Sequence, residues 1–132
     1  MLATPSEVEG VLRRINRNWE VVRLRNYVTS PKSSGYRAHH LVVERDGRRI
    51  EVQLRTRGQQ EWADAVEQFA NRFGLPLKDE QGPDEVLDFF RIAAQGIYGD
   101  EYGATTEEAN QVMARFTAAQ ETMQHWVAEH RR

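Results

Sequence analysis

Five polar side chains of kinds that bind nucleotides or move protons are expected to share one face of a β-hairpin. An Asp46-Gly47 pair separates two apolar alternations, residues 41–43 and 50–54, and Asp-Gly between such runs is a strong signal for a two-residue turn. Because side chains alternate strictly along a strand, this register predicts that five residues point to one side of the sheet: Tyr36, His40, Glu51, Gln53 and Arg55.

These residue types together suit a nucleotide. Tyr36 can stack on a base, and the cationic side chains of Lys32 and Arg55 can bind phosphates. Glu51 can accept a proton or bind a magnesium ion. The alternative is a solvated outer sheet face, where such polar side chains are ordinary. Spacing alone leaves both interpretations open.

The other side of the same hairpin is predicted to face the core. Its residues are apolar with one exception, and they pair across the turn as His39 with Leu54, Leu41 with Val52, and Val43 with Ile50. The exception, His39, is therefore expected to be a buried packing residue rather than a ligand.

Periodicity predicts the elements that must hold this hairpin in place. Thr4-Pro5-Ser6-Glu7 is a good helix start, and the helix is expected to end near Asn18. The remaining predicted elements are a strand at 19–24, a loop at 26–35, a helix after Thr56 that Gly74 stops, a helix at about 83–98 and a last helix at about 106–130.

The composite is one α/β (α+β) domain over residues 1–132. Its sheet should lie within residues 19–56, and residues 57–132 should be helical. The helices are expected to pack on the sheet face that carries Leu41 and Val43.

Charge is divided unevenly along the chain. Residues 1–57 hold 12 of the 18 basic and 6 of the 20 acidic residues, whereas residues 58–132 are strongly acidic. A basic half suits a polyanion such as a nucleotide or RNA, although a solvated face of arginines is the common alternative. The absence of cysteine removes disulfides and thiolate chemistry. No signal peptide or membrane span is recognisable, so the expected compartment is the cytoplasm, without a membrane partner.

Two segments resemble the alarmone synthetases of the RelA/SpoT family. Residues 27–40 read Tyr-Val-Thr-Ser-Pro-Lys-Ser-Ser-Gly-Tyr-Arg-Ala-His-His, similar to the family's guanosine-binding loop. Residues 51–56 read Glu-Val-Gln-Leu-Arg-Thr, similar to its Glu-Ile-Gln-Ile-Arg-Thr strand. The two motifs stand in the family's order and at its separation, and the resemblance covers about residues 11–67.

This resemblance implies a nucleotidyltransferase-like fold with a mixed sheet, and transfer of pyrophosphate from ATP to the 3′-hydroxyl of GDP or GTP. In the family, the residue matching Tyr36 stacks on guanine and the one matching Lys32 contacts the acceptor's phosphates. The residue matching Glu51 helps to bind Mg²⁺ and to activate the 3′-hydroxyl, with Gln53 and Arg55 beside it as catalytic residues. The other implied substrate-binding residues are Ser34, Arg37 and His40.

The chain also departs from the family pattern. Asn26 stands where the family has aspartate, Ser34 where it has asparagine, and His39 where it has an aliphatic residue. Family members carry, upstream, a basic segment that grips ATP and an Asp-x-x-Gly-x-Arg motif that supplies the main magnesium ligand. Neither is found here, so we expect an N-terminally truncated domain whose full activity needs ATP bound with a complementing partner chain.

Two other functions stay open on the sequence. One is a non-catalytic module that senses guanine nucleotides or regulates a full-length relative, for which a homo-oligomer or a partner chain is possible. The other is a toxin-type relative that transfers pyrophosphate to the 3′ end of tRNA, which the basic N-terminal half would fit.

Overall fold

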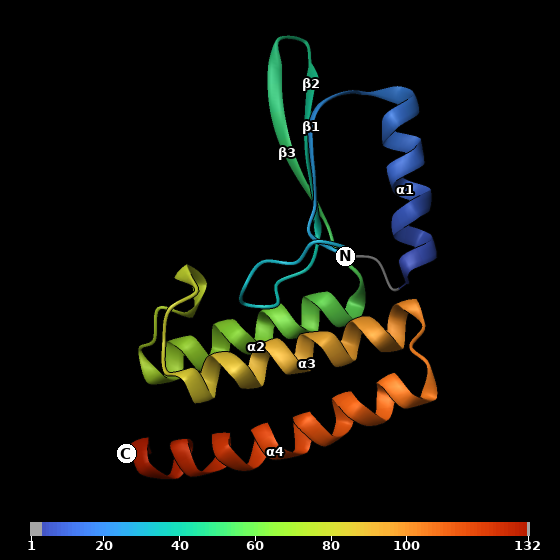
Figure 1. Cartoon of the computed structure of the whole chain (residues 1–132). Helices are drawn as coiled ribbons and strands as arrows, with labels where there is room; N and C mark the ends of the chain where they lie inside the picture. Colours follow the sequence, from blue (N-terminus) through green and yellow to red (C-terminus); the bar gives the residue numbers. More distant parts are fainter. Residues whose placement is uncertain (1–3, 132) are drawn as a thin grey trace.

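The computed structural model describes residues 4–131 of the chain (Figure 1). In order along the chain the elements are α1 Pro5–Asn18, β1 Glu20–Asn26, β2 His39–Arg45, β3 Arg48–Leu54, α2 Arg57–Phe73, the short 3₁₀ helix η1 Leu77–Asp79, α3 Asp84–Tyr102 and α4 Thr106–His130. The α+β class and every predicted helix are confirmed.

The three strands form one antiparallel sheet in the order β1-β2-β3. The turn at Asp46 and Gly47 produces the predicted register, with His40 opposite Gln53 and Val42 opposite Glu51. Both turn residues have positive φ, 53° and 73°, as a two-residue hairpin of this type requires. The two faces of the hairpin are therefore those that the sequence predicts.

Helix α1 covers the apolar face of the sheet. Val8 and Leu12 of α1 are buried against Leu41 of the central strand. Thr4 caps this helix, because its side chain accepts a hydrogen bond from the Glu7 amide. The prediction that Ile50 is buried was wrong, since this side chain is 46% exposed at the turn end of an edge strand.

The hairpin also buries the histidine of its apolar face. His39 is only 5% exposed, which confirms the prediction of a buried packing residue. Its partner Leu54 and the neighbouring Val52 are half-buried, whereas Leu41 and Val43 are fully enclosed. Burial on this face therefore falls from the central strand towards the edge.

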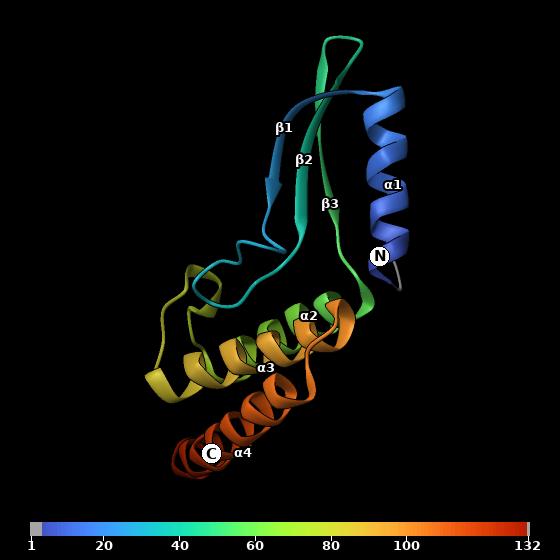
Figure 2. The same ribbon diagram turned by 45° about the vertical axis from the view of Figure 1, so that its right-hand side comes forward.

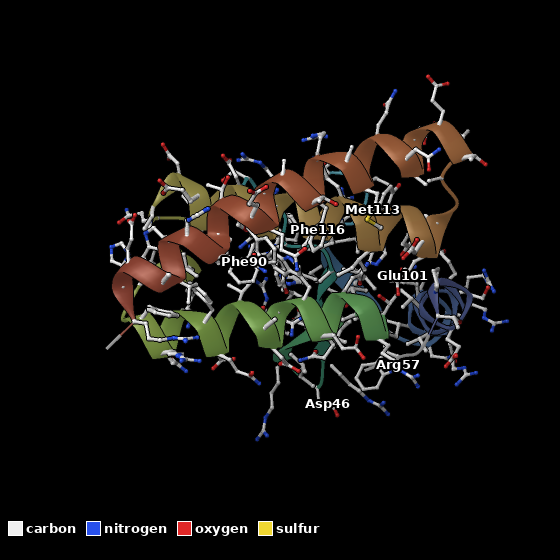
Figure 3. The ribbon with its side chains drawn as sticks, turned by 90° about the horizontal axis from the view of Figure 1, so that it is seen from below. Asp46, Arg57, Phe90, Glu101, Met113 and Phe116 are labelled. Carbon is white, nitrogen blue, oxygen red and sulfur yellow. The ribbon has the colours of Figure 1, made fainter. Side chains whose placement is uncertain are left out.

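The other three helices lie at one end of the sheet rather than over its face (Figures 1 and 2). Their core contains Trp62 of α2, Val86 and Phe90 of α3, and Met123 and Trp126 of α4. Seen from below, Phe90 lies between α2 and α4 (Figure 3). The indole of Trp62 donates a 2.7 Å hydrogen bond to the Phe90 carbonyl, which fixes α2 against α3.

Helix α3 continues past the end predicted near Tyr98 to Tyr102. Gly96 and Gly99 both lie within the helix. A Cβ on Gly99 would lie 3.2 Å from the Ala104 side chain, so this glycine allows close packing at the end of the helix. In residues 4–131, no helix has the length and apolarity needed to cross a bilayer.

Candidate functional site

The hydroxyl of Tyr36 is the centre of a hydrogen-bond network on the open face of the sheet. It accepts hydrogen bonds from Arg55 Nη2 at 2.8 Å and Nε at 3.2 Å. It also lies 2.7 Å from Nε2 of His40. Although residues 35–38 are not in a strand, this network keeps Tyr36 on the predicted face.

The proton of that hydroxyl can be assigned from its partners. A phenol oxygen accepts two hydrogen bonds and donates one, and Arg55 already supplies two donors. The Tyr36 hydroxyl is therefore assigned as the donor of the hydrogen bond to His40 Nε2, and the imidazole that accepts this hydrogen bond is neutral. Burial lowers the pKa of His40, and the charges of Lys32 and Arg55 act in the same direction against the opposing effect of Glu51.

The network continues along β3. Nη2 of Arg55 also donates to Oε1 of Gln53 at 2.8 Å, and Nε2 of Gln53 donates to Oε1 of Glu51 at 3.4 Å. Arg55 is held from the other side by Oε1 of Gln60, on α2, at 3.1 Å. Glu51 is exposed and, within residues 4–131, its side chain has only this one long hydrogen bond, so its carboxylate is the freest acceptor of the network.

The junction between β3 and α2 fixes the position of Arg55. Thr56 is fully buried and caps α2 through a reciprocal capping box with Gln59. Its hydroxyl donates a 2.7 Å hydrogen bond to Glu101 at the end of α3. Glu101 therefore ties the helical part of the molecule to the strand end that carries Arg55.

Strand β1 and the residue that follows it add three residues that sequence reasoning missed. Arg23, Arg25 and Tyr27 line a recess of about 220 Å³ together with His40 and Glu51. The alternation Arg-x-Arg-x-Tyr was a usable signal. The predicted strand stops at residue 24, so this alternation was not followed to its end. A bulge between Val21 and Arg23 then determines which face of the sheet the two arginines occupy.

Lys32 reaches this recess from the loop between β1 and β2. Its ammonium lies 5.2 Å from the centre of the Tyr27 ring and 5.4 Å from that of Tyr36. The Tyr27 ring also packs edge-on against His40, with ring centres 5.1 Å apart. The loop thus brings one positive charge over a small aromatic cluster.

Other loop residues shape the backbone. Oδ1 of Asn26 accepts hydrogen bonds from the amides of Val28 and Thr29, at 2.9 and 3.2 Å, and so starts the loop. The hydroxyl of Ser34 accepts a 3.3 Å hydrogen bond from the Tyr36 amide. Ser34 therefore helps to hold the loop backbone just before Tyr36.

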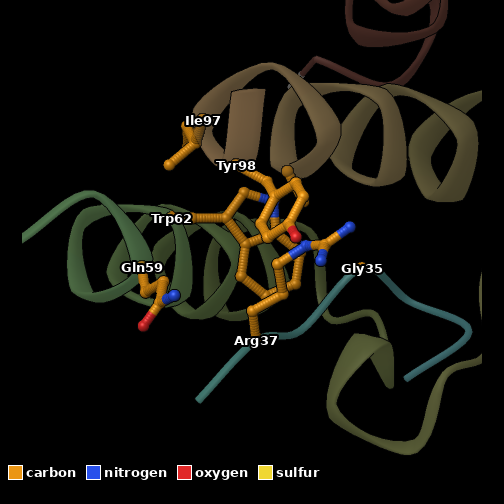
Figure 4. Close-up of a pocket in the computed structure, with 7 residues that line it drawn as sticks. Gly35, Arg37, Gln59, Trp62, Ile97 and Tyr98 are labelled. Carbon is orange, nitrogen blue, oxygen red and sulfur yellow. The ribbon is translucent and has the colours of Figure 1, made fainter. Parts of the chain in front are cut away.

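Arg37 lies apart from the other predicted site residues. Its guanidinium lies over the ring of Tyr98, 4.0 Å from the ring centre (Figure 4). It also donates a hydrogen bond to the Val28 carbonyl. Burial lowers the pKa of Arg37, and Nε has no hydrogen-bond partner in the described chain. The structure therefore places Arg37 between the loop and α3.

The carboxylates of the site are sparse. Among residues 4–131 there is no group of three or more histidine, aspartate or glutamate side chains that could hold a metal ion. Glu51 is the one carboxylate that lines the recess. A magnesium ion here would need most of its ligands from phosphates and water, a mode that Mg²⁺ commonly adopts.

Three solved structures are similar to this chain in fold. The chain is similar to small alarmone synthetase 2 from Bacillus subtilis, with 21% identity over 76% of this chain and 58% of that one and a TM-score of 0.62. It is similar to a GTP pyrophosphokinase family protein from Streptococcus pneumoniae, with 23% identity, 90% and 62% coverage and a TM-score of 0.60. Small alarmone synthetase 1 from Bacillus subtilis, solved with its product pppGpp, gives 20% identity, 87% and 59% coverage and a TM-score of 0.59.

These likenesses establish the fold. The chain spans about three fifths of the length of each of these relatives. No curated protein sequence matches it significantly. The family model described as the region found in RelA/SpoT proteins matches residues 1–71, which include α1, the whole sheet and most of α2. The chain therefore belongs to the RelA/SpoT family.

Proposed function

We propose that the open sheet face binds GDP or GTP as the acceptor in pyrophosphate transfer from ATP. The observation that carries the proposal is the Tyr36 network, in which one aromatic residue is fixed by Arg55 and His40 beside a free carboxylate. Family membership supports it, because the matched region includes every residue of this network. The proposal assigns the acceptor side of the reaction to these residues.

Guanine would stack on the aromatic cluster in place of the Lys32 ammonium. A single cation over a ring contributes about 0.5–1 kcal/mol at an exposed site, whereas base stacking on an aromatic side chain contributes about 1–3 kcal/mol. Lys32 has a flexible stem and can move from the rings to a phosphate. Arg23 and Arg25 add two further positive charges at the recess for the same phosphates.

Glu51 is the residue best suited to accept the proton of the 3′-hydroxyl. His40 Nε2 is already occupied by its hydrogen bond with the Tyr36 hydroxyl, whereas the Glu51 carboxylate is exposed and weakly bonded. In the transfer, O3′ loses its proton to Glu51 and bonds to the β-phosphorus of ATP, and the bond to AMP breaks. Gln53 positions the Glu51 carboxylate and Arg55 positions the Tyr36 hydroxyl. Neither residue exchanges a proton in the reaction.

Mg²⁺ is the metal that we propose for this site. Glu51 would supply one ligand, with phosphate oxygens and water as the others. The bound ion would neutralise phosphate charge during transfer. The use of ATP and a guanine nucleotide makes the cytoplasm the proposed compartment.

The test is an equilibrium binding measurement with GDP and GTP, followed by an assay with ATP. We expect guanine-nucleotide binding and little 3′-pyrophosphorylated product from the chain alone, because a single carboxylate makes a weak metal site. A complementing chain that binds ATP should raise the yield. Product on tRNA with none on GDP or GTP would favour the toxin-type activity, and the absence of guanine-nucleotide binding at millimolar concentration would contradict the proposal.

A further inference from the structure

We propose that Glu80 is a positioning residue that holds the loop of residues 32–36 in its binding conformation. The inference rests on the proposed function, because this loop carries Lys32 and Tyr36. Oε1 of Glu80 accepts a 2.8 Å hydrogen bond from the Ser33 hydroxyl and a 3.2 Å hydrogen bond from the Ser34 amide. No feature of the sequence near the loop predicts this contact, which joins residues 46 and 47 positions apart.

The backbone at Glu80 is unusual for this residue type. Glu80 follows η1, and its φ of 60° and ψ of 30° lie in the left-handed region. Glycine adopts this conformation freely, whereas a residue with a Cβ is disfavoured there by about 1–2 kcal/mol. A glutamate in this disfavoured conformation suggests that its side chain has a role, and we assign that role to the hydrogen bonds with the loop.

The segment that presents Glu80 is itself anchored. Leu77, in η1, is buried in the core of the helical part. The amide of Glu80 donates a 3.0 Å hydrogen bond to the Leu77 carbonyl. Figures 1 and 2 show this connection, between α2 and α3, rising beside the loop below the sheet. A fixed carboxylate can therefore act on the loop from the helical side.

Backbone hydrogen bonds within the loop link the two serines held by Glu80 to Lys32. The Gly35 amide donates to the Lys32 carbonyl at 2.9 Å, and the Lys32 amide donates to the Tyr36 carbonyl at 3.2 Å. This tight turn has Ser33 and Ser34 at its tip, where Glu80 holds them. Lys32 meanwhile extends over the Tyr27 and Tyr36 rings, so Glu80 restrains the loop without occupying the place of the ligand.

The contact is charged and solvent-exposed. The hydrogen bond from Ser33, followed by that from the Ser34 amide, lowers the pKa of Glu80, so the carboxylate is ionised at neutral pH. Hydrogen bonds to a charged group are stronger than neutral ones. Because this contact is exposed to solvent, it should favour the binding conformation without holding the loop rigidly.

Glu80→Gly separates positioning from structural support. It removes the carboxylate and also the backbone strain, so the melting temperature should stay the same or rise. GDP binding should weaken by about threefold to tenfold, because the loop then orders only when the ligand binds. Glu80→Gln keeps an acceptor oxygen without the charge, and its affinity should lie between those of the wild type and Glu80→Gly.

The matched control is Asp79→Asn, which removes a carboxylate from the adjacent exposed position of η1. In the described chain Asp79 has no side-chain hydrogen bond to the loop, so this variant should bind GDP like the wild type. Amide exchange provides a readout that needs no nucleotide. The Ser34 amide should exchange faster in Glu80→Gly and at the wild-type rate in Asp79→Asn.

These measurements test the positioning role of Glu80 separately from the proposed binding of a guanine nucleotide. Weaker GDP binding and faster Ser34 exchange at unchanged melting temperature would support the positioning role. Unchanged affinity and exchange, or a fall in melting temperature that accounts for the loss of binding, would overturn it. If the wild type binds no guanine nucleotide, the proposed function fails, and Ser34 exchange alone decides whether Glu80 orders the loop.

Discussion

Tyr36 and Arg55 meet through a 2.8 Å hydrogen bond from Nη2 of the guanidinium to the phenol oxygen, although they lie 19 positions apart in the chain. Tyr36 belongs to the loop, and Arg55 directly follows β3. Their contact joins the two segments whose sequences resemble the family, so the two motifs meet at one candidate site.

The Tyr36 hydroxyl should matter for binding more than for folding. Tyr36→Phe keeps the ring but leaves Arg55 and His40 without their shared partner, so GDP binding should weaken by about threefold to tenfold. The melting temperature should change by a few degrees at most. Calorimetric titration with GDP and thermal unfolding of the same samples measure both effects.

Tyr36→Ala should affect both properties. Tyr36 is half-buried and packs against the helical core near Trp62. Truncating a partly buried aromatic ring costs part of the about 3–5 kcal/mol seen for fully buried ones. GDP binding should weaken tenfold to a hundredfold after correction for the folded fraction, in line with about 1–3 kcal/mol of stacking. Equal losses in Tyr36→Phe and Tyr36→Ala would argue against a stacked base.

The effect of Mg²⁺ on GDP binding should depend on Glu51. Mg²⁺ should strengthen GDP binding to the wild type and have a smaller effect on Glu51→Gln. The matched variant is Glu44→Gln on the same face, where the carboxylate lies 3.8 Å from Arg49 near the turn. Both positions are solvent-accessible, so unfolding free energies should change by about 0.5 kcal/mol or less. An equal loss of the Mg²⁺ effect in both variants would mean that general charge, not Glu51, is responsible.

Gly35 in the loop should be less replaceable than Gly47 in the hairpin turn. Its φ is 98°, and an added Cβ would lie 2.9 Å from Ala94 Cβ and 3.1 Å from Arg91 Cα. Gly35→Ala should therefore destabilise the fold by about 2–4 kcal/mol, from strain and overpacking together. Gly47→Ala isolates the strain, because φ is 73° there and no atom lies within 4 Å of the added carbon. Urea unfolding should show Gly35→Ala as clearly the worse of the two.

The stability of the fold should fall in mild acid. Burial lowers the pKa of His39 below its usual 6.5, so the unfolded chain takes up the proton more readily than the folded one. Stability from this group is present above pH 6.5 and is lost as the pH falls through the lowered value. His40, whose pKa burial also lowers, should add to this slope.

His39→Leu provides the test of that slope. Leucine suits the buried face and does not titrate, so the difference in unfolding free energy between pH 7.5 and pH 5.5 should shrink. It should not vanish, because His40 remains. Urea titrations at both pH values measure the difference, and an unchanged difference would rule out His39 as a contributor.

Local patterns predicted the hairpin and its two faces, and the reason is physical. The Asp46-Gly47 turn fixes the register, and strict alternation then assigns every side chain of β2 and β3. The rule says nothing of residues outside the regular strands. Arg37 lies outside the strand, and its direction is set by contact with Tyr98 on α3.

Long-range contacts and irregular backbone account for the rest. The bulge in β1 decides that Arg23 and Arg25 face the recess, and no simple periodicity reveals a bulge. The loop contact of Glu80 depends on how η1 is placed by its buried Leu77. Nor does local sequence show that α2, α3 and α4 pack at the end of the sheet, since an amphipathic helix does not specify its partner.

Mapping of GDP by two-dimensional NMR tests the central claim most directly. If the open face is the acceptor site, adding GDP should shift the resonances of Tyr27, Tyr36, His40, Gln53 and Arg55. The resonances of the outer groove between α3 and α4, around Met113, should not move. No shift at millimolar GDP, or shifts confined to the helical part of the molecule, would contradict the claim.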